Sequence, residues 1–170
     1  MAARVLFVAA MVVVACGDPV RDRATAALPA EVPGVPKGPL HRPGQPCLVC
    51  HSEAGGKSVF SLAGTVFVSA DSSAPIEDVS VNMVDSLGRK FKTVTNCAGN
   101  FMVRPEEYSP HPPIWVGLQR GDVFRDMNTV IYREGSCAAC HYEPPGPASA
   151  GRVYLADSPE VAARVVSRCR

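Results

Sequence analysis

The stretch VSVNMVD, residues 79–85, decides the fold class, because apolar and polar side chains alternate along it. A period of two turns one face of a strand toward a core and the other toward solvent. Similar short runs, separated by turn residues, cover residues 61–68, 91–95, 101–103, 114–118, 129–132 and 151–155. Short strands at this spacing predict an all-β sandwich.

Length and charge narrow the class of protein. The chain has 170 residues, enough for one domain with a core. Its 17 Lys and Arg residues are balanced by 16 Asp and Glu residues. No basic excess is available to neutralise phosphates, so we expect no nucleic-acid partner. Sixteen prolines argue against a helical bundle.

The first residues predict export. Arg4 precedes an unbroken apolar run, Val5 to Ala15, that is too short to span a bilayer and is typical of a signal peptide over residues 1–15. The end of the run, residues 13–17, resembles the bacterial lipobox, with Val13 where that motif usually has Leu. The resemblance implies lipidation of Cys16 and a membrane anchor in the cell envelope, on the periplasmic or outer-membrane face; an ordinary cleaved signal is the alternative. Residues 16–40 are rich in Pro and predict a semi-stiff tether.

Two copies of one cysteine motif stand 90 positions apart: CLVCH at residues 47–51 and CAACH at residues 137–141. C-x-x-C-H is the attachment signature of c-type haem, in which two thiols bond the porphyrin edge and the histidine binds the iron. The sequence therefore predicts two covalently bound haem c groups. Cys47, Cys50, Cys137 and Cys140 would attach them, and His51 and His141 would bind the irons.

Other chemistries use the same residues. Two C-x-x-C pairs can also give four thiolates to one tetrahedral zinc ion. Plain disulfides or redox-active thiols are a third interpretation. The histidine after each pair, and the oxidising compartment outside the cytoplasm, favour haem over zinc.

The chain has two further histidines, His41 and His111, each flanked by prolines. One spare histidine for each motif predicts bis-histidine ligation of both irons. Met127 is the rival ligand, whereas Met83 and Met102 lie in strand-like patterns and are expected in the core.

The order of strands and turns resembles the carboxypeptidase regulatory-like domain, a transthyretin-like sandwich. The matching segments are residues 63–66, 75–81, 85–88 and 95–101. Such modules serve as binding or scaffold units. The chain departs from the pattern by carrying Cys97 in its Thr-Asn turn. The flanking C-x-x-C-H copies resemble small multihaem c-type cytochromes, and together they imply a sandwich over residues 41–157 with haem-binding loops at both ends.

The end of the chain predicts a short helical tail over residues 158–170, with Ser158 as its N-cap and Pro159 at the first position. Cys97 and Cys169 are the thiols left over in an exported protein, so we expect them to form a disulfide; free or metal-binding thiols are the alternative.

These features predict a membrane-anchored dihaem cytochrome that exchanges electrons with redox partner proteins and has no substrate chemistry of its own. A peroxidase would need an open axial position. The alternative is a β-sandwich lipoprotein, stabilised by zinc or disulfides, that acts as a surface binding or scaffold module.

Overall fold

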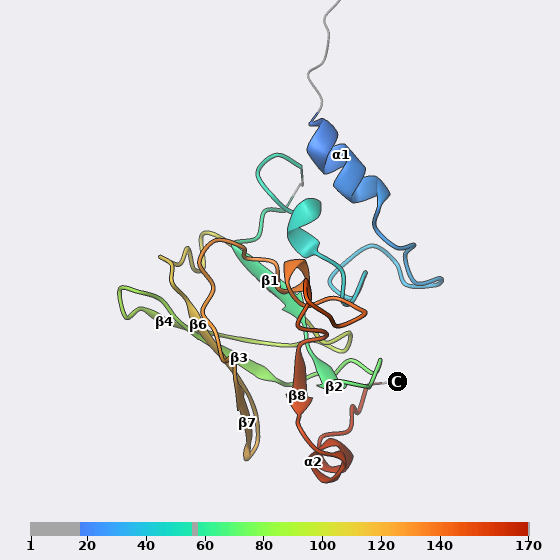
Figure 1. Ribbon diagram of the computed structural model, residues 1–170, viewed down its shortest axis with the longest axis vertical. Helices are drawn as coiled ribbons and strands as arrows, with labels where there is room; N and C mark the ends of the chain where they lie inside the picture. Colours follow the sequence, from blue (N-terminus) through green and yellow to red (C-terminus); the bar gives the residue numbers. More distant parts are fainter. Residues whose placement is uncertain (1–17, 56–57, 170) are drawn as a thin grey trace, which may run out of the picture.

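The computed structural model describes residues 18–55 and 58–169 (Figure 1). The predicted signal peptide and the predicted lipidation site, Cys16, lie outside these residues. Within the described part of the chain, no helix is long and apolar enough to cross a membrane.

The largest sheet has four antiparallel strands in the order β4-β3-β6-β7. Their bounds are Lys90–Val94, Ser80–Val84, Trp115–Arg120 and Val123–Asp126. Two smaller sheets complete the sandwich. β1 (Leu62–Thr65) pairs antiparallel with β5 (Asn100–Val103), and β2 (Phe67–Ser69) pairs parallel with β8 (Tyr154–Ala156).

One apolar core lies between these sheets. The alternation in β3 buries Val81 and Met83, and Leu118 reaches the same core from β6. Val66, Val103 and Leu155 enter it from the smaller sheets or beside them. The all-β sandwich predicted from the alternating stretch is confirmed, and so is the short C-terminal helix.

The turn after β3 is built on one buried carboxylate. Asp85 accepts hydrogen bonds from the backbone N–H groups of Leu87, Arg89 and His111, at 3.0, 2.9 and 3.1 Å. The Arg89 guanidinium adds an ion pair at 2.6 Å. Gly88, at φ 73°, supplies the left-handed residue that closes the turn into β4. These contacts hold the pKa of Asp85 at about 2, against the opposing effect of desolvation.

Both ends of the described chain carry a short helix (Figure 1). α1 (Pro19–Ala26) is capped by Asp18, and α2 (Pro159–Arg164) is capped by Ser158. α1 differs from the extended tether expected over residues 16–40. Asp18 followed by Pro19 is a helix-start signal within the Pro-rich composition.

Candidate functional site: the paired cysteine turns

The two C-x-x-C-H motifs have the same backbone structure. The first cysteine turn, residues 47–51, contains the 3-10 turn η1 (Cys47–Val49), and the second, residues 137–141, contains η2 (Cys137–Ala139). In each turn the N–H of the second cysteine donates to the carbonyl of the first, at 3.2 and 3.1 Å. The following histidine N–H donates to the same carbonyl, at 2.9 Å in both turns. Each turn therefore carries its two thiols on one tight loop.

The histidine of each turn is held through its Nδ1 atom. His51 Nδ1 donates to the Ser58 carbonyl at 2.8 Å, and His141 Nδ1 donates to the Gly151 carbonyl at 3.0 Å. A carbonyl can only accept, so the proton of the neutral ring lies on Nδ1. Nε2 of each ring therefore carries the lone pair.

The second turn is seated on strand β1. Residues 135 and 136 run parallel to β1, with the Ala63 N–H donating to the Gly135 carbonyl at 2.9 Å. Gly64 is the contact point, because a Cβ at this position would lie 2.7 Å from Cys137 Sγ. Only glycine lets the turn approach the strand this closely.

The segment just before the first turn in the sequence contacts the same strand. The Gly44 N–H donates to Thr65 Oγ1 at 2.7 Å, and the His51 ring stacks on Phe60 with centroids 4.5 Å apart. The side chain of Leu48 lies against Gly135, since a Cβ on that glycine would be 3.2 Å from Leu48 Cδ2. The two cysteine turns therefore adjoin one another on β1, although 86 residues separate Cys50 from Cys137 in the sequence.

The four thiols differ in environment. They are free in the structure, and only Cys140 is exposed. Burial raises the pKa of Cys137 to about 12, and the charge of the neighbouring Cys47 contributes to this rise. Burial also raises the pKa of Cys47 to about 11. At neutral pH both first cysteines are therefore protonated thiols.

The spare histidines take different positions. His41 lies beside the first turn, with its ring centroid 5.8 Å from that of His51. His111 is held instead in the Asp85 turn, where its Nδ1 accepts from Arg89 Nη2 at 2.8 Å. The structure therefore places His41 beside the first turn and His111 in the turn built on Asp85.

The predicted cofactors need correction. In residues 18–55 and 58–169, no three side chains among His, Cys, Asp and Glu are placed to hold a metal ion. The predictions of two haem c groups, and of zinc in their place, are wrong on this finding. The physical reason lies in how the donors are placed: each turn histidine is anchored to its own loop, and His111 is held by Arg89 in the turn built on Asp85, so no three donors converge within the described residues.

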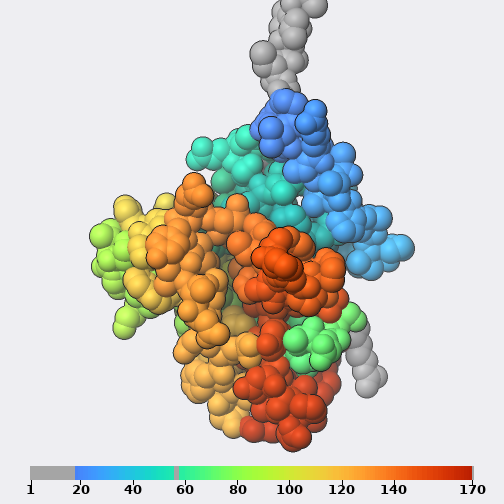
Figure 2. Space-filling model, in the orientation of Figure 1, coloured from blue at the N-terminus to red at the C-terminus, as the bar shows by residue number. Residues whose placement is uncertain are grey.

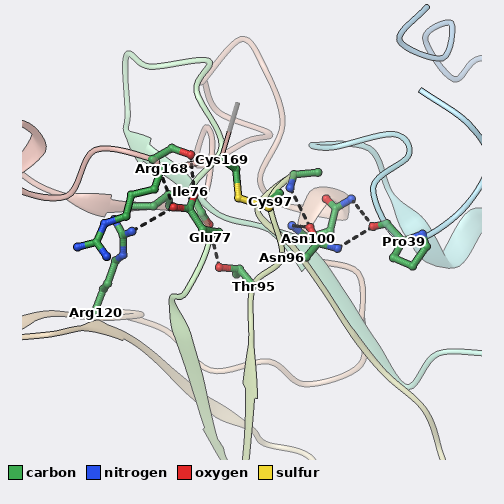
Figure 3. Close-up of a disulfide and its surroundings, with 12 residues drawn as sticks. Pro39, Ile76, Glu77, Thr95, Asn96, Cys97, Asn100, Arg120, Arg168 and Cys169 are labelled. Atoms are coloured by element: carbon green, nitrogen blue, oxygen red, sulfur yellow. Dashed lines mark hydrogen bonds and ion pairs between the residues drawn. A yellow bond between two sulfur atoms is a disulfide. The ribbon is translucent and has the colours of Figure 1, made fainter. Parts of the chain in front are cut away.

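A disulfide joins Cys97 and Cys169, the pairing that the sequence predicts (Figure 3). Glu77 secures the tail beside it, accepting from Ser167 Oγ at 2.5 Å and the Arg168 N–H at 2.6 Å and pairing with Arg120 at 3.3 Å. On the other side, Asn96 Nδ2 donates to the Pro39 carbonyl at 2.8 Å. The disulfide loop thus connects the C-terminal tail with the segment that leads into the first turn.

A groove opens beside the second turn, in the part of the chain drawn in orange on the face shown in Figure 2. Its volume is about 610 Å³, and Cys137, Cys140 and His141 form part of its wall. Arg125 and Tyr154 also line it. Sequence reasoning missed these two, because only the approach of β7 to β8 brings them together.

Comparisons of the chain with protein-family models, with curated proteins and with solved structures find no match.

Proposed function

We propose that this chain transfers electrons in the cell envelope and that the paired cysteine turns are its redox centre, with the four thiols as carriers. The observation that carries the proposal is the duplication of one loop geometry at two adjoining places on β1. Export and a lipid anchor on Cys16 are part of the proposal and rest on the N-terminal sequence.

Each turn is suited to a reversible disulfide. A turn closed between positions i and i+3 keeps its end Cα atoms within about 7 Å. Disulfides join Cα atoms about 4.4–6.8 Å apart. Oxidation of one turn converts two thiols into one disulfide and releases two electrons and two protons. Exposed Cys140 is the sulfur that a partner protein can reach.

The exchange with a partner disulfide balances in two steps. The Cys140 thiolate attacks one partner sulfur, forming a mixed disulfide and expelling the other partner sulfur as a thiolate. The Cys137 thiol then loses its proton and attacks the Cys140 sulfur, forming the disulfide of the second turn and releasing the remaining partner thiolate. The partner gains two electrons and takes up the two protons that the turn has lost. Cys47, next to Cys137, gives the second turn a route to the first.

The test is differential alkylation of the exported protein across a series of thiol–disulfide buffers, read by mass spectrometry. We expect both turns to change between dithiol and disulfide across the buffer series. The Cys50→Ser variant should shift the buffer potential at which the second turn is half oxidised. The Cys97→Ser, Cys169→Ser double variant is the matched control and should leave the half-oxidation potentials of both turns unchanged. Turns that never form an internal disulfide would overturn the proposal.

A second role, as a binding or scaffold module without electron transfer, has support of its own. The Cys97–Cys169 disulfide and the groove beside the second turn favour it. The Cys50→Ser, Cys140→Ser double variant separates the two roles. It cannot form a disulfide within either turn, so electron transfer would be lost, whereas capture of the same partner would persist if the chain is a scaffold.

A further inference from the structure

The groove beside the second turn has the dimensions and lining of a small-molecule site. Its volume of about 610 Å³ falls within the usual range of ligand pockets, about 300–1,000 Å³. Val116 and Leu118 of β6 face it from the sandwich interior, and Val153 and Tyr154 close the opposite side. The lining is therefore apolar where β6 approaches β8.

Arginines provide the charge in this groove. The Arg125 guanidinium carbon lies 3.8 Å from the centroid of the Tyr154 ring. A guanidinium that stacks on a ring keeps its N–H donors at its edge, free for an anion. Among residues 18–55 and 58–169, neither Arg125 nor Arg133 has an ion-pair partner. The third arginine, Arg152, is paired with Glu143 at 3.6 Å.

Within the described residues, the carboxylates of the lining form no ion pair with Arg125 or Arg133. Glu134 Oε1 accepts from the Ser136 N–H at 2.8 Å. Asp126 lies over Gly117, where a Cβ would be 2.5 Å from its Oδ1 atom. Because Gly117 alternates with Val116 and Leu118, Asp126 belongs to the opposite face of the sheet. The groove thus combines an apolar lining with two unpaired cations.

We infer that this groove binds a small amphipathic carboxylate, with its apolar body between β6 and β8 and its carboxylate on Arg125 and Arg133. A guanidinium offers two parallel donors to a carboxylate, and the apolar side chains beside half-buried Arg125 reduce the screening of the pair by water. The inference goes beyond electron transfer and does not depend on it, because no thiol takes part in binding.

Pyrenebutyrate is the probe, since it joins a fluorescent apolar ring system to one carboxylate. We expect saturable binding to the full chain, weakened about tenfold by either Arg125→Gln or Arg133→Gln, as the loss of one charge-assisted hydrogen bond implies. Arg104→Gln, an exposed arginine outside the groove, is the matched control. Pyrenemethylamine, with the same ring and the opposite charge, should bind more weakly.

Three results would overturn the inference: no saturable binding, equal binding of the two probes, or unchanged affinity in both groove variants. The far-ultraviolet circular dichroism of each variant checks that it is folded. The Cys50→Ser variant, whose changed side chain lies outside the lining of the groove, should bind the probe like the parent even if its thiol redox behaviour changes, so failure of the redox proposal and failure of this inference are distinguishable.

Discussion

Removal of the Cys97–Cys169 disulfide, by Cys97→Ala together with Cys169→Ala, should lower the free energy of unfolding. The bond joins positions 72 residues apart. Closing a loop of that length restricts the unfolded chain by about 4 kcal/mol in the chain-entropy model. This is a large share of the roughly 5–15 kcal/mol that holds a domain of this class together. The Glu77 contacts, the bond from Arg120 to the Val165 carbonyl and the buried Val165 side chain would then hold the tail (Figure 3).

Urea unfolding, followed by circular dichroism and by the fluorescence of Trp115, measures the loss. Trp115 is the sole tryptophan and lies in β6, within the segment that the disulfide closes, so its fluorescence reports on the unfolding of the sandwich. Cys50→Ala is the control for loss of a thiol without loss of a disulfide. A double variant within about 0.5 kcal/mol of the parent, the range of an ordinary surface substitution, would refute the reasoning.

Other predictions concern single groups. Hydrogen bonds from Ser167 and Arg168, with the Arg120 charge, outweigh desolvation and lower the pKa of Glu77 from its ordinary 4.5. Ionised Glu77 therefore stabilises the folded protein at any pH above its unfolded-state pKa, and this stabilisation is lost as the pH falls through the lower folded-state pKa. In that acidic range the free energy of unfolding, measured with urea, should depend less on pH in Glu77→Gln than in the parent. Burial raises the pKa of Cys137 from its ordinary value of 9.0 to about 12, so at neutral pH this thiol is ionised about a thousandfold less than an ordinary cysteine. Buried Cys137 should therefore be alkylated far more slowly than exposed Cys140, and equal rates by mass spectrometry would contradict this. Gly64→Ala should destabilise by about 1–3 kcal/mol and alter Cys137 alkylation, whereas Gly146→Ala, with open space around it, should do neither.

Alternation and turn chemistry predicted much of the fold. The strand within residues 79–85 was predictable because one of its faces packs into the core, which leaves alternating apolar side chains in the sequence. β7 was missed, because Phe124 and Asp126 are exposed and no apolar face repeats along it. Residues 129–132 have strand-forming side chains but contribute only the bridge between Ile114 and Ile131. There, tertiary packing overrides local propensity.

The sequence predicted the residues of the site but not how the two cysteine turns pack together. The motif spacing identified the four thiols and both turn histidines, and local hydrogen bonds explain why the two turns fold alike. Their meeting on β1 depends on Gly64 and Gly135, whose close contacts appear only when distant segments pack together. The groove has the same origin, since its walls come from β6, β7, β8 and the second turn.

The central proposal is that the two adjoining cysteine turns form one thiol redox centre. The most direct measurement is the intact and peptide mass of the exported protein, poised under reducing and then oxidising conditions. We predict that each turn gains and loses one internal disulfide while Cys97–Cys169 stays closed. Turns that do not respond, or a covalent adduct on Cys47, Cys50, Cys137 or Cys140, would contradict the proposal.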